Sequence, residues 1–216
     1  LGRGPRFRLD AEMLRDQALT ASGLLVRDFG GPSVKPPQPD GLWHAVGYSK
    51  SDTVRFVTDK GSKVHRRSIY TFWKRTAPPP QMTAFDAPSR EFCVVRRERT
   101  NTPLQALLLM NDPQFVEAAR NLAQRTLQEG GNSPSVRAAW AFSLVTCRPP
   151  SPADLDDLLG AYHDHLETYR NDPDAAKDLI RIGPSQRDPD LDPSELATWT
   201  MVANLILNLD RTITKD

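Results

Sequence analysis

Residues 66–109 read RRSIYTFWKRTAPPPQMTAFDAPSREFCVVRRERTNTPLQALLL and concentrate arginines, aromatic residues and prolines. In residues 68–73, β-branched and aromatic residues favour a strand, and the prolines at 78–80 must end it. Further along, Thr102 precedes Pro103, and Gln105 completes a T-x-x-Q capping box. The stretch therefore predicts a strand, an irregular connection and the start of a helix.

The same proline signal recurs along the rest of the chain. Among the nineteen prolines, six that directly follow a helix-capping residue predict helix starts. The pairs are Thr102-Pro103, Asp112-Pro113, Ser133-Pro134, Ser151-Pro152, Asp172-Pro173 and Asp192-Pro193. Because proline suits the first helical position and Ser, Thr or Asp suits the position before it, each pair predicts a helix start.

Helical signals are sparser near the N-terminus. Apolar residues at helical spacing predict one helix from near Asp10 to near Gly23. Residues 30–41 contain so many glycines and prolines that they predict a loop, and Trp43 is expected to anchor that loop to the core. Residues 53–58 and 64–73 flank a turn at 59–62, so we expect a small β-hairpin there.

The expected fold is mainly α, with a helical C-terminal bundle, one N-terminal helix, a small β-hairpin and long proline-rich ordered loops. We divide the chain at residues 1–101 and 102–216, packed as one compact unit. With 38% hydrophobic and 25% charged residues, the composition is typical of a globular protein.

The arginines of the opening stretch have two interpretations. Residues 66–99 carry eight Arg or Lys against three acids. The guanidinium groups could hold the irregular connection in place by bonding carbonyls and carboxylates of the protein itself. Alternatively they could form an anion-binding surface. The candidate residues are Arg66, Arg67, Arg75, Arg96, Arg97 and Arg99.

Charge and hydropathy restrict the partners. The net charge is only +1, and residues 151–216 carry fourteen acids against six bases. Because a nucleic-acid binder needs a basic face without such a counterweight, we expect no nucleic acid partner. No apolar run reaches the roughly 18 residues that a membrane-spanning helix needs, so we expect no membrane span.

Catalytic motifs are weak. The sequence contains no P-loop, no G-x-S-x-G and no H-E-x-x-H. His163 and His165 are two residues apart, so on a helix they cannot share a metal, and we expect no metal site. The acid–base alternative is that His65 works with Asp86 or Glu91.

The stretch from Arg66, extended to MNDPQFVEAAR, resembles a planctomycete-specific domain of unknown function. FRLDAEMLRDQALTASGLL, GGPSVKPPQPDGLW and MVANLILNLDRTITKD agree with it, so the resemblance runs from Phe7 to Lys215. It implies the C-terminal part of large exported proteins that also carry planctomycete cytochrome-c-like domains. An extracytoplasmic location follows from the resemblance. Since the chain begins at Leu1 rather than Met, we interpret it as a fragment.

The exported setting bears on cofactors and cysteines. The sequence has no C-x-x-C-H, so we expect no cofactor in this fragment, while haem would belong to upstream domains. In an exported protein the two cysteines, Cys93 and Cys147, could form a disulfide; equally, both could be small buried hydrophobic residues.

Two classes of function remain open, because the sequence does not decide whether the protein is an enzyme. One is a non-catalytic module that docks onto upstream domains of the parent protein or binds an anionic ligand, such as an acidic polysaccharide, through the arginines. The other is part of a hydrolytic or redox-coupled enzyme, in which arginines orient an anionic substrate beside the acid–base residues.

Overall fold

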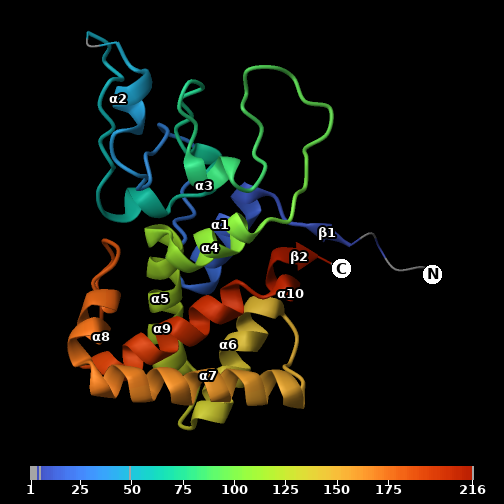
Figure 1. The fold of residues 1–216 in the computed structure, drawn as a ribbon, viewed down its shortest axis with the longest axis vertical. Helices are drawn as coiled ribbons and strands as arrows, with labels where there is room; N and C mark the ends of the chain where they lie inside the picture. Colours follow the sequence, from blue (N-terminus) through green and yellow to red (C-terminus); the bar gives the residue numbers. More distant parts are fainter. Residues whose placement is uncertain (1–3, 5, 49, 216) are drawn as a thin grey trace.

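The computed structural model describes residues 4, 6–48 and 50–215, and these are mainly helical (Figure 1). The helices are α1 (Ala11–Ala21), α2 (Leu42–Val46), α3 (Pro80–Thr83), α4 (Pro103–Asn111), α5 (Pro113–Glu129), α6 (Pro134–Thr146), α7 (Pro152–Asn171), α8 (Pro173–Ile180), α9 (Pro193–Leu207) and α10 (Asp210–Ile213). Besides them, the described residues form the 3₁₀ helices η1 (Gly61–His65) and η2 (Ser68–Tyr70) and the strands β1 (Phe7–Arg8) and β2 (Thr214–Lys215). The predicted mainly α fold is confirmed.

All six helix starts predicted from the proline pairs are confirmed. The first residues of α4 to α9 are Pro103, Pro113, Pro134, Pro152, Pro173 and Pro193. The Asp112 side chain accepts a hydrogen bond from the Gln114 backbone N–H at 2.9 Å. Asp192 accepts one from the Glu195 N–H at 2.8 Å. Because such caps satisfy donors that the first helical turn leaves free, these starts depend on local sequence alone.

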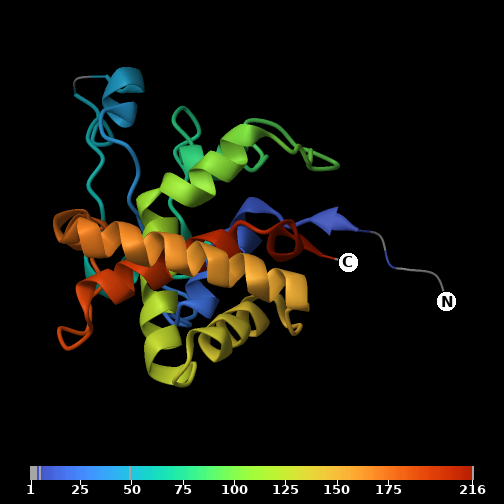
Figure 2. The ribbon, with the colours of Figure 1, turned by 60° about the horizontal axis from the view of Figure 1, so that its bottom comes forward.

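Helices α5 and α9 cross at the centre of the bundle, and α6, α7 and α8 pack around them (Figures 1 and 2). Trp199, Val202 and Ile206 of α9 are almost completely buried. The ring of Tyr162, on α7, lies 5.0 Å from that of Trp199, centroid to centroid. Because α9 meets neighbours on several sides, it is apolar nearly all round, as expected of a central helix.

The N-terminal part shares this core. Helix α1 packs against α5, and its Leu14 and Ala18 belong to the same buried cluster as Met82 of α3. One hydrophobic core therefore includes residues from both sides of the boundary drawn at residues 101 and 102. The strands β1 and β2 pair antiparallel, which brings the two ends of the described chain together, although sequence analysis did not predict this pair.

The β-hairpin predicted at residues 53–58 and 64–73 is wrong. Residues 53–58 form no strand, and residues 64–73 hold η1, η2 and two isolated parallel bridges to residues 26 and 34. The cause is a tertiary contact, in which the Arg15 guanidinium donates hydrogen bonds to the carbonyl oxygens of Val64 and Arg66. The Ser68 N–H in turn donates to Asp16 at 2.7 Å. Backbone groups that a hairpin ladder would need are bonded to α1 instead.

Trp43 anchors the N-terminal loops, but not on the main core. Its side chain is 2% exposed and packs against Phe56 and Phe72, with ring centroids 5.0 and 5.4 Å away. The ammonium groups of Lys35 and Lys74 lie 5.4 and 4.8 Å from the centre of its ring. Trp43 therefore organises a smaller aromatic cluster, in which the two lysines cover the indole.

Thr102→Ala tests the cap that starts α4. In the predicted capping box, the Thr102 side chain pairs with the Gln105 backbone N–H, and Gln105 Oε1 accepts from the Thr102 N–H at 3.4 Å. We expect the substitution to lower the free energy of unfolding by about 1 kcal/mol, the usual loss for a Ser or Thr cap. Urea unfolding measures this. Thr76→Ala is the control, because Thr76 is exposed and bonds to none of the described residues. Unchanged stability of Thr102→Ala would contradict the cap.

Candidate functional site

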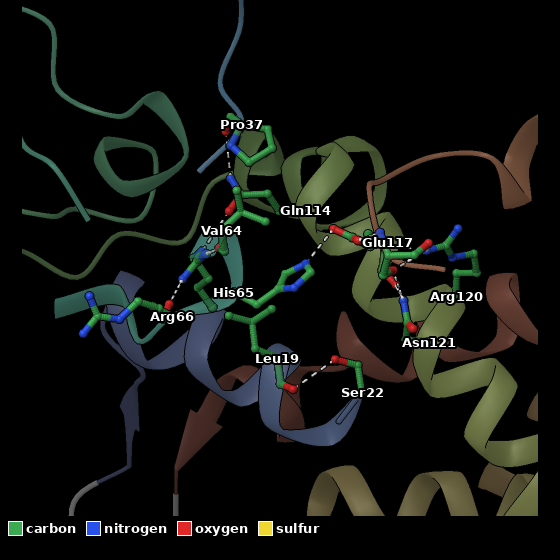
Figure 3. Close-up of polar contacts among 12 residues, drawn as sticks. Leu19, Ser22, Pro37, Val64, His65, Arg66, Gln114, Glu117, Arg120 and Asn121 are labelled. Atoms are coloured by element: carbon green, nitrogen blue, oxygen red, sulfur yellow. Dashed lines mark hydrogen bonds and ion pairs between the residues drawn. The ribbon is translucent and has the colours of Figure 1, made fainter. Parts of the chain in front are cut away.

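His65 and Glu117 form a buried pair between η1 and α5 (Figure 3). His65 Nε2 lies 3.2 Å from Glu117 Oε2, and the two side chains are 9% and 3% exposed. Since an ionised carboxylate can only accept hydrogen bonds, Nε2 is the donor in this contact. Sequence analysis did not select this partner, which lies 52 residues from His65 along the chain.

The other oxygen of Glu117 holds the loop after α8. Glu117 Oε1 accepts a hydrogen bond from the Ser185 N–H at 2.7 Å. Arg120 donates to the carbonyls of Ile180 and Ser185, at 2.9 and 2.7 Å. Burial acts most strongly on Glu117 and raises its pKa, but the hydrogen bonds from His65 and Ser185 outweigh it, so the pKa is lowered overall.

Gly183 is required for this loop to approach Glu117. Its φ of +91° lies in the left-handed region, and a Cβ atom there would come within 2.5 Å of the Glu117 side chain. Both observations exclude a larger residue without rearrangement. The close fit shows that the network is packed as part of the interior.

This network is not arranged as a serine triad. A serine triad needs the histidine between the hydroxyl and the carboxylate. Here Glu117 stands in the middle, and the Ser185 hydroxyl accepts from Asn121 at 2.7 Å and from Arg120. His65 is bonded to Glu117 instead of Asp86 or Glu91, its expected acid–base partners.

Asp86 and Glu91 have other positions. Asp86 accepts hydrogen bonds from the Thr100 N–H at 2.7 Å and from the Thr100 hydroxyl at 2.9 Å. Asp86 itself has a φ of +60°, in the left-handed region that Asp tolerates better than most residues. Glu91 is exposed in the following loop. The structure thus uses Asp86 to close a loop and does not bring it to His65.

Arg66 is a structural residue. It is 7% exposed, and its guanidinium donates to the carbonyls of Asp28 at 3.2 Å, of Pro32 at 2.9 Å and of Gly30. The guanidinium carbon also lies 4.0 Å from the centre of the Tyr70 ring. These contacts hold the glycine-rich loop that sequence analysis predicted, as the structural interpretation expects.

Two further arginines pair with carboxylates of α1. Arg97 donates to both oxygens of Glu12, at 2.6 and 3.1 Å, and lies 3.6 Å from Asp10. Hydrogen bonding to Glu12 raises the pKa of Arg97. Arg67 is half exposed and lies 3.5 Å from Asp16. Sequence analysis assigned the arginines no particular carboxylates, and the structure shows that α1 supplies them.

The remaining arginines do not join them. Arg75 and Arg96 are exposed, and neither bonds to any of the described residues. Arg99 lies over the ring of Phe7, with its guanidinium carbon 4.9 Å from the ring centre. Of the six candidate arginines, Arg66 is buried, while Arg67 and Arg97 line the same cleft.

An open cleft of about 880 Å³ runs beside α1 and combines charged and apolar side chains. Its lining includes Asp10, Glu12, Asp16, Arg27, Arg67, Arg90, Arg97, Met13, Phe29 and Ile69. Phe29 and Ile69 are 83% and 71% exposed. The guanidinium carbon of Arg90 lies 4.6 Å from the centre of the Trp73 ring. The cleft thus brings Arg67 together with Arg27 and Arg90, which sequence analysis did not select.

Cys93 and Cys147 are both free and exposed, so neither the bridge nor the buried alternative is present in this structure. Across the described ranges, no three His, Cys, Asp or Glu side chains come together as a metal site. Within the same part of the chain, no helix is both long and apolar enough to cross a bilayer.

Fold and site together define a mainly helical domain with a polar network in its interior and an open cleft beside its first helix. The chain belongs to the PSD1 family, described as a protein of unknown function (DUF1553), whose model matches residues 1–162. The expected membership of a family of unknown function is confirmed. No curated protein and no solved structure matches the chain.

Arg66→Ala tests the structural role of this arginine. Truncation removes charged hydrogen bonds worth about 1.5–3 kcal/mol each. Because water can replace some of these bonds, we expect the free energy of unfolding to fall by about 2 kcal/mol or more. Arg75→Ala is the control and should change stability by less than about 0.5 kcal/mol, because Arg75 is exposed. Urea unfolding of the two variants measures both. Equal stabilities would contradict the role.

Glu117→Gln tests the buried pair through its pH dependence. A carboxyl whose pKa is lowered on folding stabilises the protein above its unfolded pKa, and that stability is lost as pH falls through the folded pKa. The free energy of unfolding of the wild type should therefore exceed that of Glu117→Gln by about 2 kcal/mol near neutral pH. This difference should shrink below about pH 4.

Urea unfolding across pH measures this difference. Glu129→Gln serves as the control, because Glu129 forms an ion pair with Arg125 but lies at the surface. Its substitution should change stability only slightly. A gap for Glu117→Gln that stays constant down to about pH 3 would rule out the carboxylate as its source.

Proposed function

We propose that this domain is a non-catalytic binding module and that the cleft beside α1 takes an anionic ligand, such as an acidic polysaccharide. The observation that supports the proposal is the combination of guanidinium groups and highly exposed apolar side chains in one open cleft. A monomeric protein seldom exposes large apolar groups beside charged ones in a hollow without a use for them.

Three arginines are available to a ligand. Arg27 is exposed and bonds to none of the described residues. Arg90 stacks on Trp73, and a stacked guanidinium keeps its N–H edges free to donate. Arg67 is half exposed, and its ion pair with Asp16 is long, at 3.5 Å. A ligand carboxylate or sulfate could therefore bind the same guanidinium group. Arg97, by contrast, is held by Glu12, and we assign it to the cleft wall.

The apolar side chains suit the faces of sugar rings. Phe29 stands beside Gly30, whose N–H donates to the Tyr70 hydroxyl at 2.8 Å and whose carbonyl accepts from Arg66. The loop that carries Phe29 is therefore held in place before any ligand arrives. A backbone that is already held in place loses little conformational freedom on binding, which favours affinity.

We also propose an extracytoplasmic setting, in which the domain lies beside haem-carrying upstream domains of a planctomycete protein. The resemblance of residues 7–215 supports this proposal, and those domains are the docking partners it implies. The acid–base alternative has less support, because it needs His65 accessible beside Asp86 or Glu91. His65 is buried against Glu117.

A binding screen tests the cleft. We expect polygalacturonate and dextran sulfate to bind, neutral dextran not to bind, and added salt to weaken binding. Arg67→Ala and Phe29→Ala should each lower affinity about fivefold, which corresponds to about 1 kcal/mol. Isothermal titration calorimetry measures these affinities. The free energy of unfolding of Arg67→Ala should be nearly the same as that of the wild type.

Arg75→Ala is the matched control, since Arg75 is also exposed but does not line the cleft. It should bind as wild type does. If Arg75→Ala lowers affinity as much as Arg67→Ala, binding is a general charge effect and the cleft is not the site. If none of the polymers binds, the proposed ligand class is wrong.

A further inference from the structure

The loop between α3 and α4 carries exposed apolar side chains in the middle of its sequence. Residues 87–99, called the outer loop below, are closed at their base by the hydrogen bonds from Thr100 to Asp86. Within the loop, Phe92 and Val95 are 73% and 106% exposed. Figures 1 and 2 both show the outer loop projecting from the body beyond the N-terminal end of α4.

Helix α4 continues this apolar surface. Leu104, Leu107 and Met110 are 62%, 57% and 45% exposed, and their spacing of three residues places them on one side of the helix. Gln105 is completely buried on the other side. Leu109 is also buried, in the core, so α4 carries aliphatic side chains on its outward side as well as on its buried side. We call these three residues the α4 stripe.

Cations accompany the apolar groups. The outer loop contains four arginines against two glutamates. One of the four, Arg97, is bonded to Glu12 of α1, but Arg96 is exposed and bonds to none of the described residues. Arg99 is also exposed, over the ring of Phe7. Helix α4 itself carries no charged residue. The surface is therefore apolar, and the outer loop beside it carries two more arginines than glutamates, with both glutamates exposed.

We propose that the outer loop and the α4 stripe rest on an anionic lipid surface. The projecting loop would insert Phe92 and Val95 below the headgroups, Arg96 and Arg99 would meet the lipid phosphates, and the stripe would lie in the interface. A fluid bilayer accepts a projecting loop without a matching groove, whereas a protein partner would have to provide one. The loop shares Arg90 and Arg97 with the cleft, but Phe92, Val95, Arg96 and Arg99 do not line it, so the lipid proposal does not rest on the proposed function.

Vesicle co-sedimentation tests the proposal. We expect the protein to bind phosphatidylcholine vesicles that contain about 30% phosphatidylglycerol more tightly than vesicles of phosphatidylcholine alone. Raising salt from about 0.1 to about 1 M should weaken binding, because the Debye length falls from about 10 to about 3 Å. Val95→Asp should weaken it about tenfold or more, since it places a charge in the inserted segment.

Val57→Asp is the matched control, because Val57 is 67% exposed and lies outside the outer loop. It adds the same charge and should bind within about twofold of wild type. Circular dichroism and urea unfolding confirm that both variants fold. Arg67→Ala should leave vesicle binding unchanged, which separates this test from that of the cleft.

Three results would overturn the lipid proposal. One is equal binding to neutral and anionic vesicles. Another is equal loss in Val95→Asp and Val57→Asp. The third is no vesicle binding, together with a concentration-dependent dimer that Val95→Asp dissociates, which would assign the surface to a protein contact instead.

Discussion

Arg15 projects from α1 into the interior, and its guanidinium donates to the carbonyls of Val64 and Arg66, to the Ser68 hydroxyl and to the Gln114 side chain. The residue is only 4% exposed, and burial lowers its pKa to about 10, so it stays charged at neutral pH. An isolated buried charge is costly, so these acceptors must stay in place. The path of η1 and η2 follows from that requirement.

The other buried polar side chains extend this constraint across the molecule. Gln114 donates to the Pro37 carbonyl at 3.0 Å, and Glu117, one turn further along α5, holds His65 and Ser185 (Figure 3). Helix α5 thus presents a polar side to the N-terminal loops and an apolar side to α9. A network of this kind specifies one arrangement of loops, because each unmade bond would leave a buried polar group without a partner.

Both functional proposals concern residues outside this network. Arg66 and Arg97 are bonded within the protein, and His65 is buried against Glu117, so these candidate residues already take part in contacts of the fold. Two surfaces remain, the cleft beside α1 and the outer loop with the α4 stripe. Each combines free guanidinium groups with exposed apolar side chains. The proposals for both rest on exposure that the fold does not otherwise explain.

The sequence by itself determined the six proline-led helix starts and the mainly α class, because caps and periodicity act within a few residues. It could also have flagged Gln114, Glu117 and Asn121 as a polar stripe at helical spacing. Only the tertiary structure decided the partners of His65 and Arg66, the absence of the expected hairpin at residues 53–58 and 64–73, and which residues line the cleft. Hydrogen bonds from Arg15 to distant carbonyls outweigh local strand propensity, and no pattern in a single sequence shows which distant groups will meet.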